Sequence, residues 1–161
     1  MILGQLPASS RIWIFQSDRL LVDEEESALL EELKKFVSGW QAHGVGLTAD
    51  AEILHSSIVV IGVDESKEPP SGCSIDKAFG LLKLFSEPSR IDFFNRLILN
   101  ISYCNSAKIL NLEQIQASLN HGDLSADSLV FNSLANNLGE LRDNTYLTIS
   151  TSWMAPKLRF A

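Results

Sequence analysis

The sequence predicts an α+β domain with a ferredoxin-like β-α-β-β-α-β core, in which a largely antiparallel sheet carries helices on one face. Two short runs, 12–15 and 58–63, are apolar at every position, which is typical of central strands. Two segments, 23–40 and 71–88, carry apolar residues at helical spacing and follow these strands in the required order. A half-buried strand at 97–103 completes the pattern.

The chain of 161 residues has the size of a single domain, which we divide into three parts. Residues 1–10 are expected to be a flexible lead-in, residues 11–104 the α+β core, and residues 105–161 a C-terminal extension. Central strands that are apolar on both faces need cover on the face that the helices leave bare. We therefore expect the extension to cover that face or to mediate dimerisation.

The first helix has the clearest pattern. Asp23 with Glu26 resembles a capping box, and the acidic run 23–26 suits the positive end of the helix dipole. Gly39 and Gly44 bracket the end of the helix. The apolar stripe comprises Leu29, Leu30, Leu33, Phe36, Val37 and Trp40.

The strand and helix that follow have less certain boundaries. Residues 45–55 form a weaker strand candidate, and the turn that ends it lies at 49–50 or at 56–57. A polar loop with a double proline comes next, and the second helix begins within 71–74 and ends at Pro88.

In the extension, Asn111 with Gln114 predicts the start of a short helix that Gly122 ends. Residues 126–142 fit either a helix or a short strand followed by a loop. Residues 146–149 are expected to form a final strand.

Composition excludes several classes of protein. Hydrophobic residues make up 45% and charged residues 20%, which argues against intrinsic disorder. A net charge of −7 argues against a general binder of nucleic acid or anionic membranes. No uncharged apolar stretch reaches the roughly 18 residues of a membrane span. Cys73 and Cys104 are too few for a secreted disulfide scaffold, and we expect a cytoplasmic protein without a metal site or cofactor.

Two short motifs stand out, W-Q-A-H-G at 40–44 and S-G-C-S-I-D at 71–76. Together with residues 11–15 and 152–153, they resemble an uncharacterised bacterial family whose members often carry the label "ABC transporter ATPase". The resemblance covers most of the chain and implies no known activity. An ATPase of that class needs a phosphate-binding loop of the form G-x-x-x-x-G-K-[ST], and the sequence has none. We therefore exclude ATP hydrolysis.

The second motif lies at the predicted start of the second helix. Free N–H groups and the helix dipole favour anions at such a position, and Gly72 would let a ligand approach the backbone. In a ferredoxin-like sheet, Arg11 would lie near this end. We expect a site for a small anionic ligand, formed by Ser71, Gly72, Ser74, Asp76 and Arg11.

A cysteine-dependent hydrolase or acyl transferase is the alternative. The expected topology places His43 and Asp64 at the same end of the sheet as Cys73. Cys73 would then be the nucleophile, His43 the base, and Asp64 or Asp76 the group that orients the base. Thiols at helix N-termini ionise more readily than free thiols, which favours this chemistry.

A purely structural interpretation stands beside both. Ser71 or Ser74 would cap the second helix, Cys73 would pack as a small buried hydrophobe, and His43 would bond the last carbonyls of the first helix. The leading hypothesis is a small cytoplasmic binding or interaction module that forms a homodimer, with no nucleic-acid partner.

Overall fold

The computed structural model describes residues 1–103 and 106–160, so Cys104 lies outside the described part of the chain. These residues form a mixed structure of helices and antiparallel sheets, which confirms the α+β class. None of the described helices is long and apolar enough to cross a membrane.

The elements follow one another along the chain in this order: β1 (Arg11–Gln16), α1 (Asp23–Ser38), β2 (Gln41–Ala42), β3 (Val45–Gly46), β4 (Thr48–Leu54), β5 (Ile58–Asp64), α2 (Gly72–Ser89), β6 (Ile98–Tyr103), β7 (Ser106–Asn111), α3 (Leu112–His121), β8 (Leu129–Phe131), α4 (Leu138–Asp143), β9 (Tyr146–Thr148), and the 3-10 turns η1 (Ile149–Thr151) and η2 (Ala155–Lys157).

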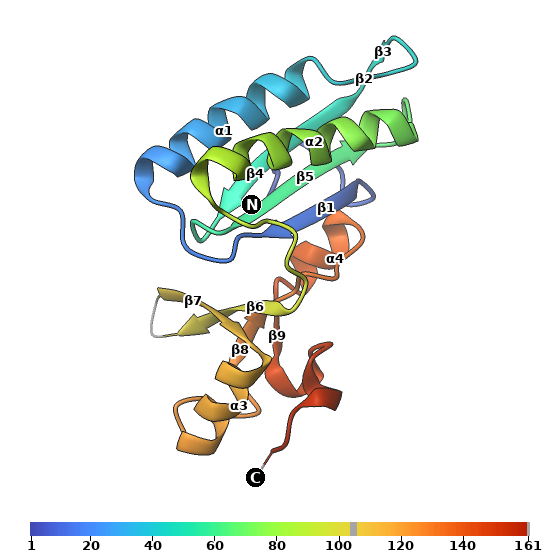
Figure 1. Cartoon of the computed structure of the whole chain (residues 1–161). Helices are drawn as coiled ribbons and strands as arrows, with labels where there is room; N and C mark the ends of the chain where they lie inside the picture. Colours follow the sequence, from blue (N-terminus) through green and yellow to red (C-terminus); the bar gives the residue numbers. More distant parts are fainter. Residues whose placement is uncertain (104–105, 161) are drawn as a thin grey trace.

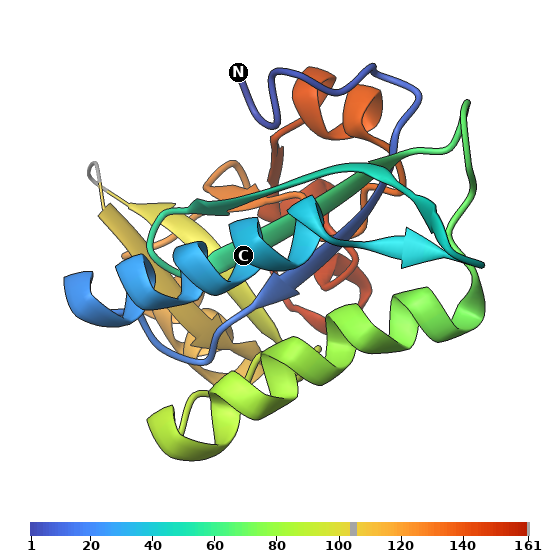
Figure 2. The ribbon, with the colours of Figure 1, turned by 90° about the horizontal axis from the view of Figure 1, so that it is seen from above.

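The first sheet has the order β1-β5-β4, and both pairings are antiparallel. Helices α1 and α2 lie side by side over one face of this sheet (Figures 1 and 2). β5 is buried along its whole length, as its uninterrupted apolar run predicts for a central strand. The first sheet thus contains three of the four strands expected in a ferredoxin-like sheet.

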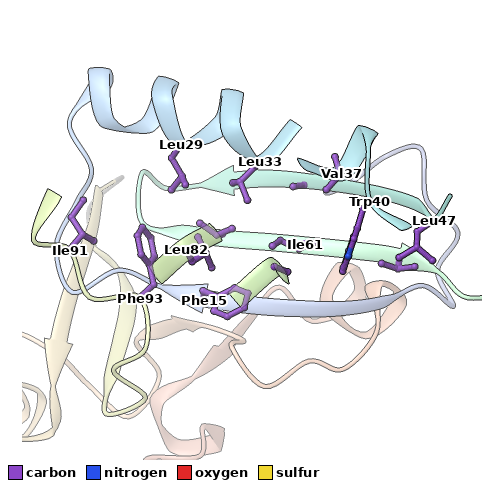
Figure 3. Packing of buried hydrophobic residues seen from close by; sticks show 14 of the residues in the cluster. Phe15, Leu29, Leu33, Val37, Trp40, Leu47, Ile61, Leu82, Ile91 and Phe93 are labelled. Atoms are coloured by element: carbon purple, nitrogen blue, oxygen red, sulfur yellow. The ribbon is translucent and has the colours of Figure 1, made fainter. Parts of the chain in front are cut away.

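The core between the helices and the first sheet follows the predicted stripe. Leu29, Leu33 and Val37 of α1 and Leu82 of α2 lie with Ile61 of β5 in one cluster between the helices and the sheet (Figure 3). Burial of each such side chain contributes about 1.5–3 kcal/mol relative to exposure. This cluster fixes both helices on the sheet.

The opposite face of the first sheet is covered by both ends of the chain. Ile12, Ile58 and Val60 pack against an apolar layer from the extension and from the N-terminal segment. That layer comprises Leu3, Leu6, Phe131, Ala135, Leu138 and Leu141. Residues of the extension and of the N-terminal segment therefore cover this face of the sheet. The prediction of a homodimer depended on a bare apolar face, and the covering of this face removes that basis.

Residues 1–10 are packed onto the sheet, which corrects the expectation of a flexible lead-in. Leu3 and Leu6 are buried, and a Cβ at Gly62 would lie 2.8 Å from a methyl group of each. Glycine at this position therefore permits the close approach. The guanidinium of Arg142 donates hydrogen bonds of 2.8 to 3.1 Å to the carbonyls of Ile2, Leu3 and Leu6.

The expected fourth strand of the ferredoxin-like sheet lies elsewhere, so that part of the topology prediction is wrong. β6 pairs with β7 and β8 in a second sheet of order β7-β6-β8-β9 (Figure 1). It meets the end of β1 through the side chain of Gln16, whose amide donates to the carbonyl of Ile98 and accepts from the amide of Asn100. Local hairpin pairing with β7 replaces main-chain pairing with β1.

Several element boundaries differ from the expectation in informative ways. Helix α1 begins as predicted, but the capping contact is one residue earlier, with the amide of Val22 donating to Glu25 at 3.1 Å. The turn between β4 and β5 lies at 55–57, close to the second of the two predicted positions. Helix α2 passes through Pro88 and ends at Ser89.

In the extension, the capping prediction for α3 is confirmed at both ends. Asn111 and Gln114 form a capping box, and Gly122 ends the helix with a φ of 81°. The ambiguous segment 126–142 contains a short strand followed by a loop and a short helix. A final strand, β9, is present where one was expected.

Candidate functional site

The motif at 71–76 begins helix α2, and its serines have capping roles. The Oγ of Ser71 accepts a hydrogen bond of 3.2 Å from the amide of Ser74, and the Oγ of Ser74 donates to the carbonyl of Ser71 at 2.8 Å. The indole of Trp40 donates to the carbonyl of Ser74. These contacts confirm the capping role in the structural interpretation.

Cys73 is exposed, so the expectation that it packs as a buried hydrophobe is wrong. Its neighbours Gly72 and Asp76 are exposed as well. A Cβ at Gly72 would meet nothing within 4 Å, and the position therefore needs no glycine for packing. In the described part of the chain, no hydrogen bond involves the Cys73 sulfur.

His43 lies at the tip of a small hairpin formed by β2 and β3. Its φ of 52° and that of Gly44, 81°, belong to the left-handed region that two-residue hairpin turns require. Helix α1 has already ended near Gly39, so His43 does not bond the last carbonyls of that helix. The side chain is exposed, and no hydrogen bond joins it to Cys73 or Asp64 within the described residues.

Asp64 and Arg11 lie at the end of the sheet from which α2 begins, and each has a local partner. The hydroxyl and the amide of Ser66 hydrogen-bond the buried carboxylate of Asp64 and lower its pKa. The guanidinium of Arg11 lies 3.6 Å from the carboxylate of Glu65 and 4.8 Å from the ring centre of Trp13. These contacts direct Asp64 and Arg11 toward neighbours other than Cys73.

A groove of about 550 Å³ lies along the outer edge of β1. Its walls come from β1, from α2, from the loop before β6, from the loop between β8 and α4, and from the C-terminal segment. The lining residues are Ile12, Trp13, Ile14, Phe15, Gln16, Phe79, Phe93, Phe94, Asn95, Arg96, Leu97, Ser133, Leu134, Ala135, Asn136 and Trp153. The groove occupies the side of β1 where a fourth strand of the sheet was expected.

Large apolar side chains around the groove remain open to solvent. Phe94 is 40% exposed, Leu97 65% and Leu134 60%. Phe94 stacks on Phe79 with ring centres 6.2 Å apart, and Phe79 meets the buried Phe15 edge to face at 5.0 Å. The groove therefore has a firm aromatic wall whose outer ring is accessible.

Polar groups in the groove are few. Gln16, Asn95, Ser133 and Asn136 supply amide or hydroxyl groups, and Arg96 is the one charged residue of the lining. Small-molecule and peptide sites commonly combine an apolar lining with a small number of polar groups that fix orientation.

A second, smaller hollow lies beside the turn between β4 and β5. It has a volume of about 330 Å³ and is lined by Leu20, His55, Ser56, Asn100, Ser102, Ala107 and Tyr146. The hydroxyl of Tyr146 is hydrogen-bonded to Nε2 of His55, and burial raises the pKa of Tyr146. This contact ties β9 to the first sheet.

Comparison with protein-family models, curated proteins and solved structures found no match. The resemblance to the uncharacterised bacterial family stays a prediction. In the described residues, no group of three or more His, Cys, Asp or Glu side chains is placed to hold a metal ion.

The groove was not predicted from the sequence. Its residues come from segments that are far apart in the chain, and their meeting depends on the placement of the second sheet. The sequence does carry one local signal: the loop before β6 contains three large apolar residues, Phe93, Phe94 and Leu97.

Proposed function

We propose that the protein is a cytoplasmic binding module whose ligand lies in the groove along β1. The observation that carries this proposal is the exposure of three large apolar side chains, Phe94, Leu97 and Leu134, around one hollow of about 550 Å³. Binding pockets typically have volumes of about 300–1,000 Å³ and a mostly apolar lining. The free, exposed thiol of Cys73 is typical of a reducing compartment.

The proposal keeps the predicted class of function but moves the site away from residues 71–76. At the start of α2, the serines cap the helix, and among the described residues no base is hydrogen-bonded to the exposed Cys73. Beside β1, by contrast, apolar surface and polar groups converge on one groove.

The proposal can be tested with 8-anilinonaphthalene-1-sulfonate, an apolar fluorescent anion that suits an apolar groove containing Arg96. The informative variants are Leu134→Asp and Leu97→Asp, which place a charge in the groove. The matched control is Leu84→Asp, because Leu84 is 72% exposed on α2 and does not line the groove. Circular dichroism and thermal unfolding verify that each variant folds.

We expect the groove variants to weaken binding of the dye about tenfold or more, because contact with one leucine side chain contributes about 1.5–3 kcal/mol. Leu84→Asp should leave the dissociation constant within about twofold of the parent. Equal effects of the groove and control variants would contradict the proposal.

A further inference from the structure

The outer edge of β1 carries main-chain groups that do not pair within the first sheet. The amide of Ser17 donates to the carbonyl of Ser57, which continues the pairing of β1 with β5. Hydrogen-bonded positions alternate along an antiparallel strand, so Trp13 and Phe15 also direct their N–H and C=O groups to β5. Ile14, between them, directs its N–H and C=O to the outer edge, beside the groove.

The chain itself already pairs with the first part of this edge. The amide of Ile12 donates to the carbonyl of Asn136 at 3.3 Å, and the amide of Leu138 donates to the carbonyl of Ser10 at 2.9 Å. This short antiparallel contact shows that the edge accepts an extended segment. At the other end of β1, the contact with β6 is made by the side chain of Gln16. Ile14 lies between these two contacts.

We infer that an extended peptide segment of a partner protein binds in the groove as an added strand, pairing with the N–H and C=O of Ile14. This inference rests on the proposed function, because it assigns a ligand class to the same groove. Strand addition gains affinity from main-chain hydrogen bonds and specificity from pockets for alternate side chains.

The two walls of the groove suit such a strand. Side chains of an added strand alternate between the two faces of the sheet. On the helix face, Phe93 is part of the first core and Phe79 packs against that core, with Phe94 stacked on Phe79. On the opposite face, Ala135 belongs to the second core and Leu134 lies next to it. Apolar residues at alternate positions of the peptide therefore find an apolar wall on both sides.

Charge further restricts the peptide. Arg96 is exposed in the lining, and no acidic side chain pairs with it in the described part of the chain. The protein as a whole carries a net charge of −7, so its surface generally repels acidic segments. A local positive charge in an apolar groove thus selects an apolar extended segment that contains one Asp or Glu.

The test uses fluorescein-labelled peptides of seven residues in which Val and Leu alternate. In each peptide a single Glu replaces the residue at one position, and the position differs from peptide to peptide. A matched control peptide carries Gln at the same position. Fluorescence anisotropy gives their affinities. The best peptide is then N-methylated in two versions, each blocking the amides along one edge of the strand. We expect one version to bind at least about tenfold more weakly and the other to bind within about twofold of the parent, because only one edge pairs with β1.

Substitutions in the protein provide an independent test of strand addition. Ile14→Pro removes the outward amide, and proline is tolerated on edge strands where the N–H faces outward. Ile14→Val keeps the outward amide and should bind the peptide more tightly than Ile14→Pro, and Leu84→Asp, which lies outside the groove, should bind it like the parent. Arg96→Gln should abolish the preference for Glu over Gln peptides, and this readout remains if Ile14→Pro fails to fold.

Several outcomes would overturn the inference. Equal sensitivity to both N-methylated versions would show that main-chain pairing is absent. Failure of every peptide, while the anilinonaphthalene dye still binds in a Leu134-dependent manner, would leave the groove as a site for a different ligand. Failure of both probes would reject the proposed function itself. A dimer that Leu134→Asp dissociates, and that competes with the peptide, would assign the edge to a second copy of the chain.

Discussion

The indole Nε1 of Trp40 donates a hydrogen bond of 2.8 Å to the carbonyl oxygen of Ser74 within the core. This bond joins the two motifs that stand out in the sequence, because Trp40 begins the first and Ser74 lies within the second. Trp40 also meets Phe36 and Trp13, with ring centres 4.9 and 6.0 Å apart. The two motifs therefore form a structural joint between the β2–β3 hairpin and helix α2.

Replacement of Trp40 tests this joint. Trp40→Phe should lower the free energy of unfolding by about 2 kcal/mol, because it removes a buried hydrogen bond and part of a buried ring. The corresponding loss in Tm is about 4–8 °C for a domain of this size. Urea denaturation and calorimetry measure both quantities. A loss below about 0.5 kcal/mol, the range of ordinary surface changes, would contradict a structural role.

The thiol of Cys73 should react independently of His43. Because Cys73 is exposed and no hydrogen bond joins it to His43, iodoacetamide should label the folded protein at the same rate in the parent and in His43→Ala. Peptide mass analysis separates this thiol from Cys104. A clear decrease in the labelling rate of the histidine variant would restore the cysteine-dependent enzyme as a candidate.

Arg142 should be a major contributor to the docking of the N-terminal segment. Arg142→Met would leave the carbonyls of Ile2, Leu3 and Leu6 without their shared donor. We expect the free energy of unfolding to fall by about 2–4 kcal/mol, since each hydrogen bond to a charged group contributes about 1.5–3 kcal/mol before exposure reduces it. Arg142→Lys should recover only part of the loss, because an ammonium cannot reproduce the guanidinium fork. Full recovery with lysine would contradict this geometry.

The ion pair between Arg19 and Glu25 makes a pH-dependent contribution to stability. Hydrogen bonds from Arg19 and from the amide of Val22 lower the pKa of Glu25 from 4.5 to about 2. A carboxylate whose pKa is lowered on folding stabilises the fold above its unfolded pKa, and this stabilisation is lost as the pH falls from 4.5 to about 2.

Glu25→Gln should therefore be less stable than the parent at pH 7, and the difference should disappear near pH 2. Urea midpoints across this range measure the effect, with Glu24→Gln as a control on the same turn of α1. High salt should reduce the difference, because the pair is partly exposed to solvent. A difference that persists unchanged at pH 2 would exclude this titration as its cause.

Local signals in the sequence predicted much of the secondary structure. The capping box of Asn111 and Gln114 and the final glycine, Gly122, define α3 as expected. The uninterrupted apolar run of β5 likewise predicted its central place in the sheet. These features succeed because capping, periodicity and burial of a strand on both faces leave traces within a few residues of the chain.

Strand pairing over long distances could not be predicted in the same way. Asn100 shows why: its polar side chain suggested a half-exposed strand, yet it is buried and donates to the hydroxyl of Ser57. Together with Gln16, it anchors β6 beside β1 without placing the two strands in one sheet. Nothing local in 97–103 distinguishes this arrangement from the ferredoxin-like one.

The candidate site was predicted less well for a related reason. Cys73 lies on helix α2 and His43 on the β2–β3 hairpin, the two elements that Trp40 joins. Their side chains are exposed and are not hydrogen-bonded to each other. The groove depends on loops near 93–97 and 133–136, which are far apart in the sequence and flank strands β6 and β8 of the second sheet.

The edge of β1 stays open at Ile14 inside the proposed binding groove. Amide hydrogen exchange followed by NMR tests it residue by residue. In the free protein, the Ile14 amide should exchange at least about tenfold faster than that of Phe15, whose N–H pairs with β5. Addition of the peptide that binds best should slow exchange at Ile14. An Ile14 amide as protected as that of Phe15 in the free protein would contradict the account, because the edge would then already be occupied.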